Sequence, residues 1–479
     1  MTPGAGCVLN ILAQTCSRRH QKDFMTPPVE RPIRNTLHRL EKTLLFLLLM
    51  VFIAFGSITL MRSAFMSYRH TDAGVYFRAA WAIQHNQNIY QITDDNGWHY
   101  HYPPTLATLL IPLSDPPHDK QSESGWKTPY PLAIAIWYAA GFLALCLGVH
   151  LLAGTLEGIA QRPAFRNPPP FSRIWWALRT WPMAICIVPI GSSLGRGQVT
   201  PFVFLFLCAM IREWSRNRSG RAGLWLAAAA SIKVFPVFLL VAPLFRRDWT
   251  FLVGFALGML VGFVLVPALA IGFPATLDLL STYWDVFSSE LIRRVDGIRS
   301  RELFNEAEGD LMSFKAVILR TYLHFKGDGL GPNPQLLSAV HIGISGIVTL
   351  ATLRSASSFG AAKNGLNRLL LALLVGTLTI AALPMVPTAQ PHYFMLSAIL
   401  VTVLIFAQWE RTGVVELSFG WIALFAAFGL LSAVSLLPRF EAMMMFGAPV
   451  YAGLILWVGG VTEMRSVNGL LKQEREAKR

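Results

Sequence analysis

Charged residues are scarce in this sequence. Only 14% of its 479 residues are Asp, Glu, Lys or Arg, whereas soluble globular domains carry about 25%. Hydrophobic residues make up 53%, and the aromatic residues include 14 Trp and 31 Phe. This composition excludes a soluble globular protein. We predict an all-α polytopic membrane protein, because continuous apolar runs satisfy their backbone polar groups in lipid by forming helices.

Cysteine is also rare. Two of the five cysteines, Cys7 and Cys16, lie in a basic N-terminal stretch, and the other three lie inside apolar runs. This spacing matches neither a disulfide framework nor a zinc site. His99 and His101 could ligate a metal, but no third ligand follows at the usual spacing; the alternative is an aromatic belt with the adjoining tyrosines. We predict no resident cofactor and no metal ligand, and dependence on a divalent metal stays open.

A Gly-rich phosphate-binding loop is absent, and so is any hydrophilic stretch long enough for a doubly wound nucleotide-binding domain. The two longest hydrophilic stretches are residues 62–130 and 274–334. An activated substrate would therefore meet this protein at the membrane surface. A lipid is the natural carrier for such a substrate.

Positive charge is unevenly distributed, although the net charge is +14. Lys and Arg gather in the N-terminal tail, residues 1–42, in alternate links between the apolar runs, and in the C-terminal tail, residues 463–479. This is the positive-inside pattern of membrane proteins, and it argues against nucleic-acid binding. We predict that both tails are cytoplasmic, that the loops 62–130 and 274–334 are extracytoplasmic, and that the protein resides in a bacterial inner (plasma) membrane.

The apolar runs set the number of spans. The first forty residues contain only the apolar patch Val8–Ala13, too short for a cleavable signal peptide, so we expect the first span to be an uncleaved anchor. Spans of full or nearly full length are expected at residues 43–61, 131–153, 175–190, 201–211, 251–273, 335–353, 369–383, 393–407, 415–437 and 450–461.

One further apolar segment, Ala222–Phe245, is flanked on both sides by arginines that favour the cytoplasm, Arg221 and Arg246. A hairpin that turns at Lys233 and Pro236 satisfies both flanks, and a single kinked span is the alternative. With this segment, the domain of residues 43–462 is expected to contain about ten to twelve transmembrane helices.

The loop after the first span carries the first candidate for chemistry. Asp72 stands at the start of the segment Thr71–Ile83, whose apolar residues recur at helical spacing. This spacing predicts an amphipathic helix at the interface. Asp72 could cap this helix. Alternatively, its carboxylate is placed to accept a proton from a hydroxyl at the bilayer surface.

Several short motifs follow in a fixed order: Tyr76, Asn88-Ile-Tyr, Tyr100-His-Tyr-Pro-Pro, Gly195-Arg-Gly-Gln-Val-Thr-Pro and Ser231-Ile-Lys-Val-Phe-Pro. In this order they resemble glycosyltransferase family 87, which includes polyprenol-phosphate-mannose-dependent mannosyltransferases. The similarity runs from about Arg39 to Trp249 and weakly onward to Gln390-Pro-His-Tyr. It implies a GT-C membrane fold, a polyprenyl-phosphate sugar donor, and an inverting transfer in which one Asp of the first outer loop, here Asp72, is the general base.

Other residues are candidates for binding the donor's phosphate or sugar. Arg196 lies in a glycine-rich turn that lets backbone amides approach an anion, and Lys233 would bring a second charge from within the membrane. Gln198 could bind a sugar hydroxyl or cap the next helix. His392 could orient sugar or phosphate, or belong to an interfacial belt. The motifs add two tyrosines, Tyr76 and Tyr102.

The sequence thus predicts an integral membrane hexosyltransferase that acts on a lipid or glycan acceptor at the extracytoplasmic face. Mannose is implied only by the family resemblance. The alternative is a membrane transporter or lipid flippase, in which broken helices also occur; a noncatalytic assembly subunit is a third possibility. Long outer loops and few acidic residues within the spans favour the enzyme. Its expected partners are the donor, the acceptor and membrane lipids, and not nucleic acid.

Overall fold

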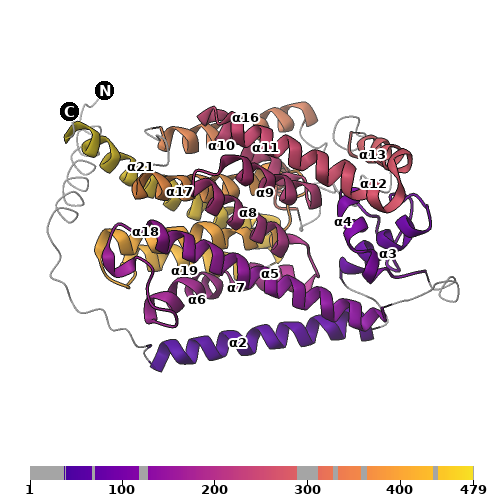
Figure 1. Cartoon of the computed structure of the whole chain (residues 1–479), viewed down its shortest axis with the longest axis horizontal. Coiled ribbons are helices and arrows are strands. Elements are labelled where there is room, and N and C mark those ends of the chain that lie inside the picture. Colours follow the sequence, from indigo (N-terminus) through magenta and orange to yellow (C-terminus); the bar gives the residue numbers. More distant parts are fainter. Residues whose placement is uncertain are drawn as a thin grey trace.

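A computed structural model describes residue 37 and residues 39–66, 71–117, 128–288, 311–326, 333–357, 364–434 and 441–477. Within these residues the chain is helical, and the only β contact is an isolated bridge between Thr93 and His99. Most of the predicted N-terminal tail, including Val8–Ala13, and much of the second outer loop lie outside the described residues. The described chain confirms the all-α class, with helices packed side by side in a bundle (Figure 1).

Six of the described helices are long and apolar enough to cross a membrane. They are α2 with η1 (Glu41–Phe65), α5 (Tyr130–Ile159), α11 to α12 (Trp249–Ile271), α16 (Pro334–Ser355), α17 with η8 (Gly365–Met385) and η9 with α18 (Pro391–Thr412). The last two are almost wholly buried and form the centre of the bundle. These helices confirm a multi-pass membrane protein.

Shorter helices complete the fold. They are α3 (Ala73–Gln84), α4 (Pro104–Leu109), η2 (Ile111–Leu113), η4 (Pro163–Phe165), α6 (Arg173–Ile185), α7 (Ile187–Gly195), α8 (Thr200–Ser215), α9 (Ser219–Ile232), η5 (Phe235–Leu240), α10 (Val241–Arg246), α13 (Phe273–Ser288), α15 (Phe314–Lys326), α19 (Phe419–Ala433), α20 (Glu441–Met445) and α21 (Ala448–Ala477). The predicted total of ten to twelve spans requires some of these, such as α8 and α19, to cross as well. The predicted C-terminal tail continues α21.

The run at residues 175–190, predicted as one span, is a bent pair of helices. The axes of α6 and α7 differ by 69°, and the break lies at Cys186. Pro189 has no N–H to bond the carbonyl of Ile185, four residues earlier, so the helical hydrogen bonding is interrupted here. The seventh span that this pair would form is therefore a broken one.

The segment Ala222–Phe245 is a hairpin, as predicted. The first leg, α9, ends at Ile232, Lys233 is extended, and the chain returns through η5 and α10. At the other end of the hairpin, Ser219 Oγ donates to Asp248 Oδ2 at 2.7 Å. The beginning and the end of the segment therefore lie together.

The first leg of this hairpin, α9, packs closely against the following span. A Cβ atom on Gly223 would lie 2.1 Å from the Phe251 carbonyl oxygen, and one on Gly254 would lie 2.1 Å from that of Gly220. Only glycine permits such an approach of two helix backbones. The contact fixes α9 against α11 and so defines where Lys233 stands.

Reporter fusions test this arrangement. Fusions after Arg218 and Arg247 should report one compartment, the cytoplasm, because Ser219 and Asp248 are in contact. Fusions after Lys472 should report the same side, and a fusion after Tyr100 the opposite side. A signal at Arg247 matching that at Tyr100 would rule out the hairpin in the membrane. The two other informative fusion points, Leu303 and Lys363, lie outside the described residues.

Candidate active site

Asp72 is the last residue before α3, a helix that is buried from Ala73 to Ile83. Its backbone N–H donates to the Arg196 carbonyl at 3.0 Å, which fixes the start of α3 against the turn after α7. The carboxylate accepts no hydrogen bond from the first turn of α3, so it does not act as a helix cap. Instead, Asp72 Oδ2 accepts a hydrogen bond from Gln198 Nε2.

Gln198 connects Asp72 with Lys233. The buried amide donates to the carboxylate through Nε2, and its Oε1 accepts a hydrogen bond from Lys233 Nζ at 3.3 Å. The capping alternative for Gln198 is not realised, because Val199 is the N-cap residue of α8 and no side chain caps that helix. The Gln198 side chain instead links the Asp72 carboxylate to the Lys233 ammonium group.

The glycine-rich turn before Gln198 is needed for close packing. Gly197 has a φ of +65°, and a Cβ atom there would lie 3.0 Å from the Cβ of Ala73. Trp137 Nε1 donates to the Gly197 carbonyl at 2.7 Å. A glycine at this position therefore lets the turn reach α3 and present Gln198 to Asp72.

Lys233 is buried at the point where α9 breaks. Its Nζ lies 3.7 Å from the centroid of the Tyr393 ring and 5.4 Å from that of Tyr102. Among the residues that the structure describes, no carboxylate forms an ion pair with it. The two rings and Gln198 offset part of the cost of burying the ammonium, and its charge is available for an anion.

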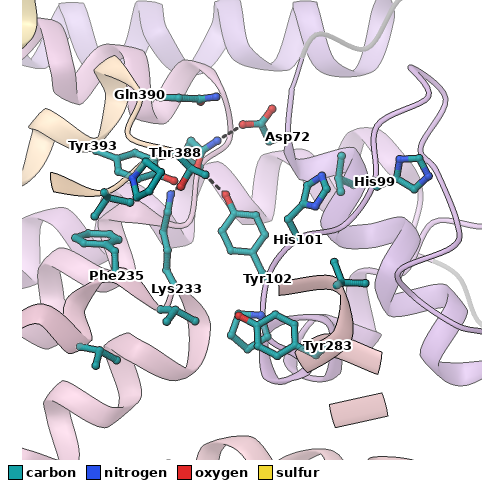
Figure 2. A pocket seen from close by; sticks show the side chains of 18 of the residues that line it. Asp72, His99, His101, Tyr102, Lys233, Phe235, Tyr283, Thr388, Gln390 and Tyr393 are labelled. Carbon is teal, nitrogen blue, oxygen red and sulfur yellow. Dashed lines mark hydrogen bonds between the residues drawn. The ribbon is translucent and has the colours of Figure 1, made fainter. Parts of the chain in front are cut away.

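Two tyrosines complete this network. The hydroxyls of Tyr76 and Tyr102 are 3.2 Å apart, and each lies 3.4 Å from Gln198 Oε1. Burial raises the pKa of both phenols well above the usual value of 10, so both stay neutral and can donate hydrogen bonds. Figure 2 shows Asp72, Tyr102 and Lys233 approaching one another from three separate segments.

Two of the cavities in the described structure adjoin this network, and the first of these has a volume of about 630 Å³. Apolar and aromatic side chains make up most of its wall, and among the described lining residues Lys233 is the one lysine or arginine. The other lining residues include Tyr76, Tyr102, Gln198, Phe235, Phe238, Tyr283, Val286, Met385, Val386 and Tyr393 (Figure 2).

The second cavity has a volume of about 720 Å³ and a more polar wall. Asp72, Val75 and Trp98 line both cavities, so Asp72 stands where the two meet. Besides Asp72, the polar residues that line the second cavity are Thr59, Arg62, Thr71, Asp94, Asn96, Ser192 and Arg196.

Comparison with known proteins identifies the family of this chain. The sequence model of glycosyltransferase family 87 matches residues 100–387, which is more than half of the chain. The chain belongs to glycosyltransferase family 87. It is thus a membrane glycosyltransferase, and the matched region contains Tyr102, Gln198 and Lys233. The transporter and assembly-subunit alternatives are not supported.

This family 87 protein is also 30% identical, over 172 residues, to the polyprenol-phosphate-mannose-dependent alpha-(1-2)-phosphatidylinositol mannoside mannosyltransferase of Mycobacterium tuberculosis. The aligned part is 34% of this chain and 36% of that relative. The chain thus matches about a third of the relative's length.

The two predicted phosphate-binding cations lie in different cavities. Lys233 lines the first and Arg196 lines the second, with Asp72 between them. His392 is buried and lines neither; its ring packs edge-on against Tyr393 with centroids 4.7 Å apart. Among the described side chains, its two ring nitrogens have no hydrogen-bond partner. The structure therefore brings Asp72, Gln198, Lys233, Tyr76 and Tyr102 together, and leaves Arg196 and His392 beside them.

The two histidines of the loop 62–130 line the first cavity. His99 and His101 have ring centroids 6.5 Å apart. Within the described parts of the chain, no group of three His, Cys, Asp or Glu residues is placed to hold a metal ion.

Several lining residues were not predicted from the sequence. Tyr393, the neighbour of the candidate His392, was not itself predicted to line the site, and its ring packs against Lys233 Nζ. Asp94 is fixed in a turn by the N–H groups of Asn96 and Trp98, both at 2.9 Å. The Asp-Asp-Asn-Gly run at residues 94–97 is a turn signal, and it could have located this part of the wall of the second cavity. Nothing in the sequence pattern pointed to Tyr283.

The pKa of Asp72 gives a pH prediction. Desolvation raises the pKa of Asp72 from 3.8 to about 6. The positive charges of Arg196 and Lys233 act in the opposite direction and lower this pKa. A general base works as the carboxylate, so kcat/KM should fall about tenfold per pH unit below pH 6. Replacing Lys233 or Arg196 by Gln should move this acid limb to higher pH. A downward shift in either variant would contradict the assignment, and a pH profile from 4.5 to 8 is the measurement.

Proposed function

We propose that this protein transfers a hexose from a polyprenyl-phosphate donor to a hydroxyl of a glycolipid or glycan acceptor, with Asp72 as general base. Mannose is the proposed sugar, by similarity to the mycobacterial relative. The observation that carries the proposal is the position of Asp72, whose carboxylate stands at the junction of two cavities of different chemistry. A base between two compartments suits a transfer between two bound substrates.

The proposed chemistry is a single displacement. Asp72 takes the proton of the acceptor hydroxyl as its oxygen forms a bond to the anomeric carbon. The bond between that carbon and the phosphate oxygen breaks, and the polyprenyl phosphate leaves with the electron pair. Because the acceptor approaches from the side opposite to the leaving group, the anomeric configuration is inverted. Positive charge near the departing phosphate lowers the barrier.

The first cavity is the proposed donor site. Its apolar wall suits the beginning of a polyprenyl chain, and its tyrosines suit a hexose, whose C–H faces pack on aromatic rings while its hydroxyls accept hydrogen bonds. Lys233 is the proposed partner of the leaving phosphate. Gln198 would hold Lys233 and Asp72 at a fixed separation, so that base and phosphate-binding group stay on opposite sides of the reacting carbon.

The second cavity is the proposed acceptor site. Asp94, Asn96 and Ser192 offer hydrogen-bonding groups to a polyol, and Arg62 and Arg196 offer positive charge to an anionic headgroup. Arg62 lies in η1, at the end of the first span, where a lipid headgroup would lie. The distribution of basic residues supports an extracytoplasmic face for this whole site, and both termini in the cytoplasm of a bacterial cell.

Lipid and glycan analysis is the direct test. Membranes from cells with and without this protein should differ by one hexose on an acceptor, and the acceptor lacking that sugar should accumulate. Purified protein in vesicles should then transfer hexose from polyprenyl-phosphate hexose to this accumulated acceptor. An unchanged lipid and glycan profile together with no transfer in vitro would refute the proposal.

The assignment of the cavities can be tested separately with Arg196→Gln. Loss of a charged hydrogen-bond partner should raise KM for the acceptor about tenfold or more, while KM for the donor stays near the parent value. Arg166→Gln, at an exposed position between α5 and α6, is the matched control and should change neither constant. A rise in the donor KM alone would place the donor in the second cavity instead.

A further inference from the structure

One side of helix α13 (Phe273–Ser288) is apolar and exposed. Phe273, Leu277 and Trp284 are 56%, 48% and 61% exposed. At about 100° per residue these three side chains fall within about 40° of one another around the helix. They form one continuous stripe, which we call the apolar stripe of α13.

The other sides of α13 differ in character. Asp278 and Asp285 are exposed and lie roughly 100° from the apolar stripe. Tyr283 and Val286 lie on the remaining side and line the first cavity. The helix is thus three-sided, with one side apolar and exposed, one acidic and exposed, and one facing the site.

The position of α13 indicates what covers the stripe. The helix directly follows the span α11 to α12 (Trp249–Ile271), and the chain turns at Gly272, whose φ is +84°. Figure 1 shows α13 at the same end of the bundle as α3 and α4. A helix that leaves a span at its end lies at the level of the lipid headgroups, where Trp and Tyr are enriched.

We propose that α13 lies flat in the membrane interface on the side of the active site, with the lipid bilayer as the partner of its apolar stripe. The stripe then enters the boundary between headgroups and acyl chains, and Asp278 and Asp285 face water. The same helix carries Tyr283 and Val286 into the wall of the first cavity. The lipid surface and the cavity therefore share one wall, which is where a lipid-linked substrate arrives. The position of α13 can be tested without any transfer assay, so this inference can fail independently of the proposed function.

Spin labelling of adjacent residues gives the test. Full-length protein with its native cysteines replaced by alanine would carry a nitroxide at Leu277→Cys or, as matched control, at Asp278→Cys, in nanodiscs of phosphatidylethanolamine and phosphatidylglycerol. The label at 277 should collide mainly with oxygen, which concentrates in lipid, and the label at 278 mainly with a water-soluble nickel complex. Equal nickel accessibility at both positions would overturn the proposal, and so would a label at 277 shielded from both reagents, because protein would then cover the stripe.

A second measurement avoids cysteine replacement in case those variants fold poorly. The parent protein and Trp284→Phe are compared in vesicles containing lipids brominated near the carbonyl or near the end of the acyl chain. The difference between the two proteins isolates the emission of Trp284. Its quenching should be strongest with bromine near the carbonyl; no quenching by either lipid would overturn the proposal.

Discussion

Asp72→Asn is expected to reduce hexose transfer by about 10²- to 10⁴-fold, roughly 3 to 5 kcal/mol of barrier, with little change in folding. Asn has nearly the same shape as Asp, and its amide oxygen can accept the hydrogen bond from Gln198 Nε2. The amide cannot accept the proton of the acceptor hydroxyl. The measurement is transfer from polyprenyl-phosphate hexose by the purified variant, together with a binding assay for the same donor.

The control for this variant is Asp278→Asn. Asp278 is an exposed carboxylate on α13 that lines neither cavity, so its conversion to an amide should leave transfer unchanged. The remaining kcat/KM of Asp72→Asn should also no longer fall below pH 6, because the carboxylate that titrates there has been removed. Transfer within about threefold of the parent would remove Asp72 from the mechanism.

Lys233→Gln is expected to lower kcat/KM for the donor about 10²- to 10³-fold, which is the usual cost of removing one charge-stabilising donor from an enclosed site. The loss arises because the phosphate gains negative charge as it departs and no other described cation lines the first cavity. Folding should not suffer. A neutral amide can still hydrogen-bond in this network, and it removes the desolvation cost of a buried ammonium.

Two comparisons make the Lys233 result specific. Arg166→Gln removes a positive charge from an exposed loop and should leave donor kinetics unchanged. Thermal unfolding in detergent should show Lys233→Gln melting no earlier than the parent. If donor kcat/KM stays at the parent value, the leaving phosphate does not contact Lys233. A melting temperature below that of the parent would mean instead that the Lys233 charge stabilises the fold.

Helix positions were largely predictable because a lipid solvent restricts the possible structures. Apolar runs in lipid form helices, so the runs at residues 43–61, 131–153 and 335–353 mark α2, α5 and α16. The hairpin around Lys233 was also predictable, since arginines at both flanks favour one side of the membrane. The bend between α6 and α7 was missed, although Pro189 is visible in the sequence, because that run is apolar throughout and length alone suggested one span.

The sequence by itself determined the class of the protein, the order of its helices and the residue types at the site. Composition, apolar runs and the motifs that resemble family 87 can be read along the chain. They identified Asp72, Gln198, Lys233, Tyr76 and Tyr102 as candidates, together with Arg196 and His392. Only the tertiary structure decided that Gln198 bonds to both Asp72 and Lys233, and that Arg196 and Lys233 line different cavities. These contacts join segments far apart in the chain. They depend on the α6–α7 bend, on Gly197 approaching Ala73, and on α9 fitting against α11, and such packing has no signature in a linear pattern.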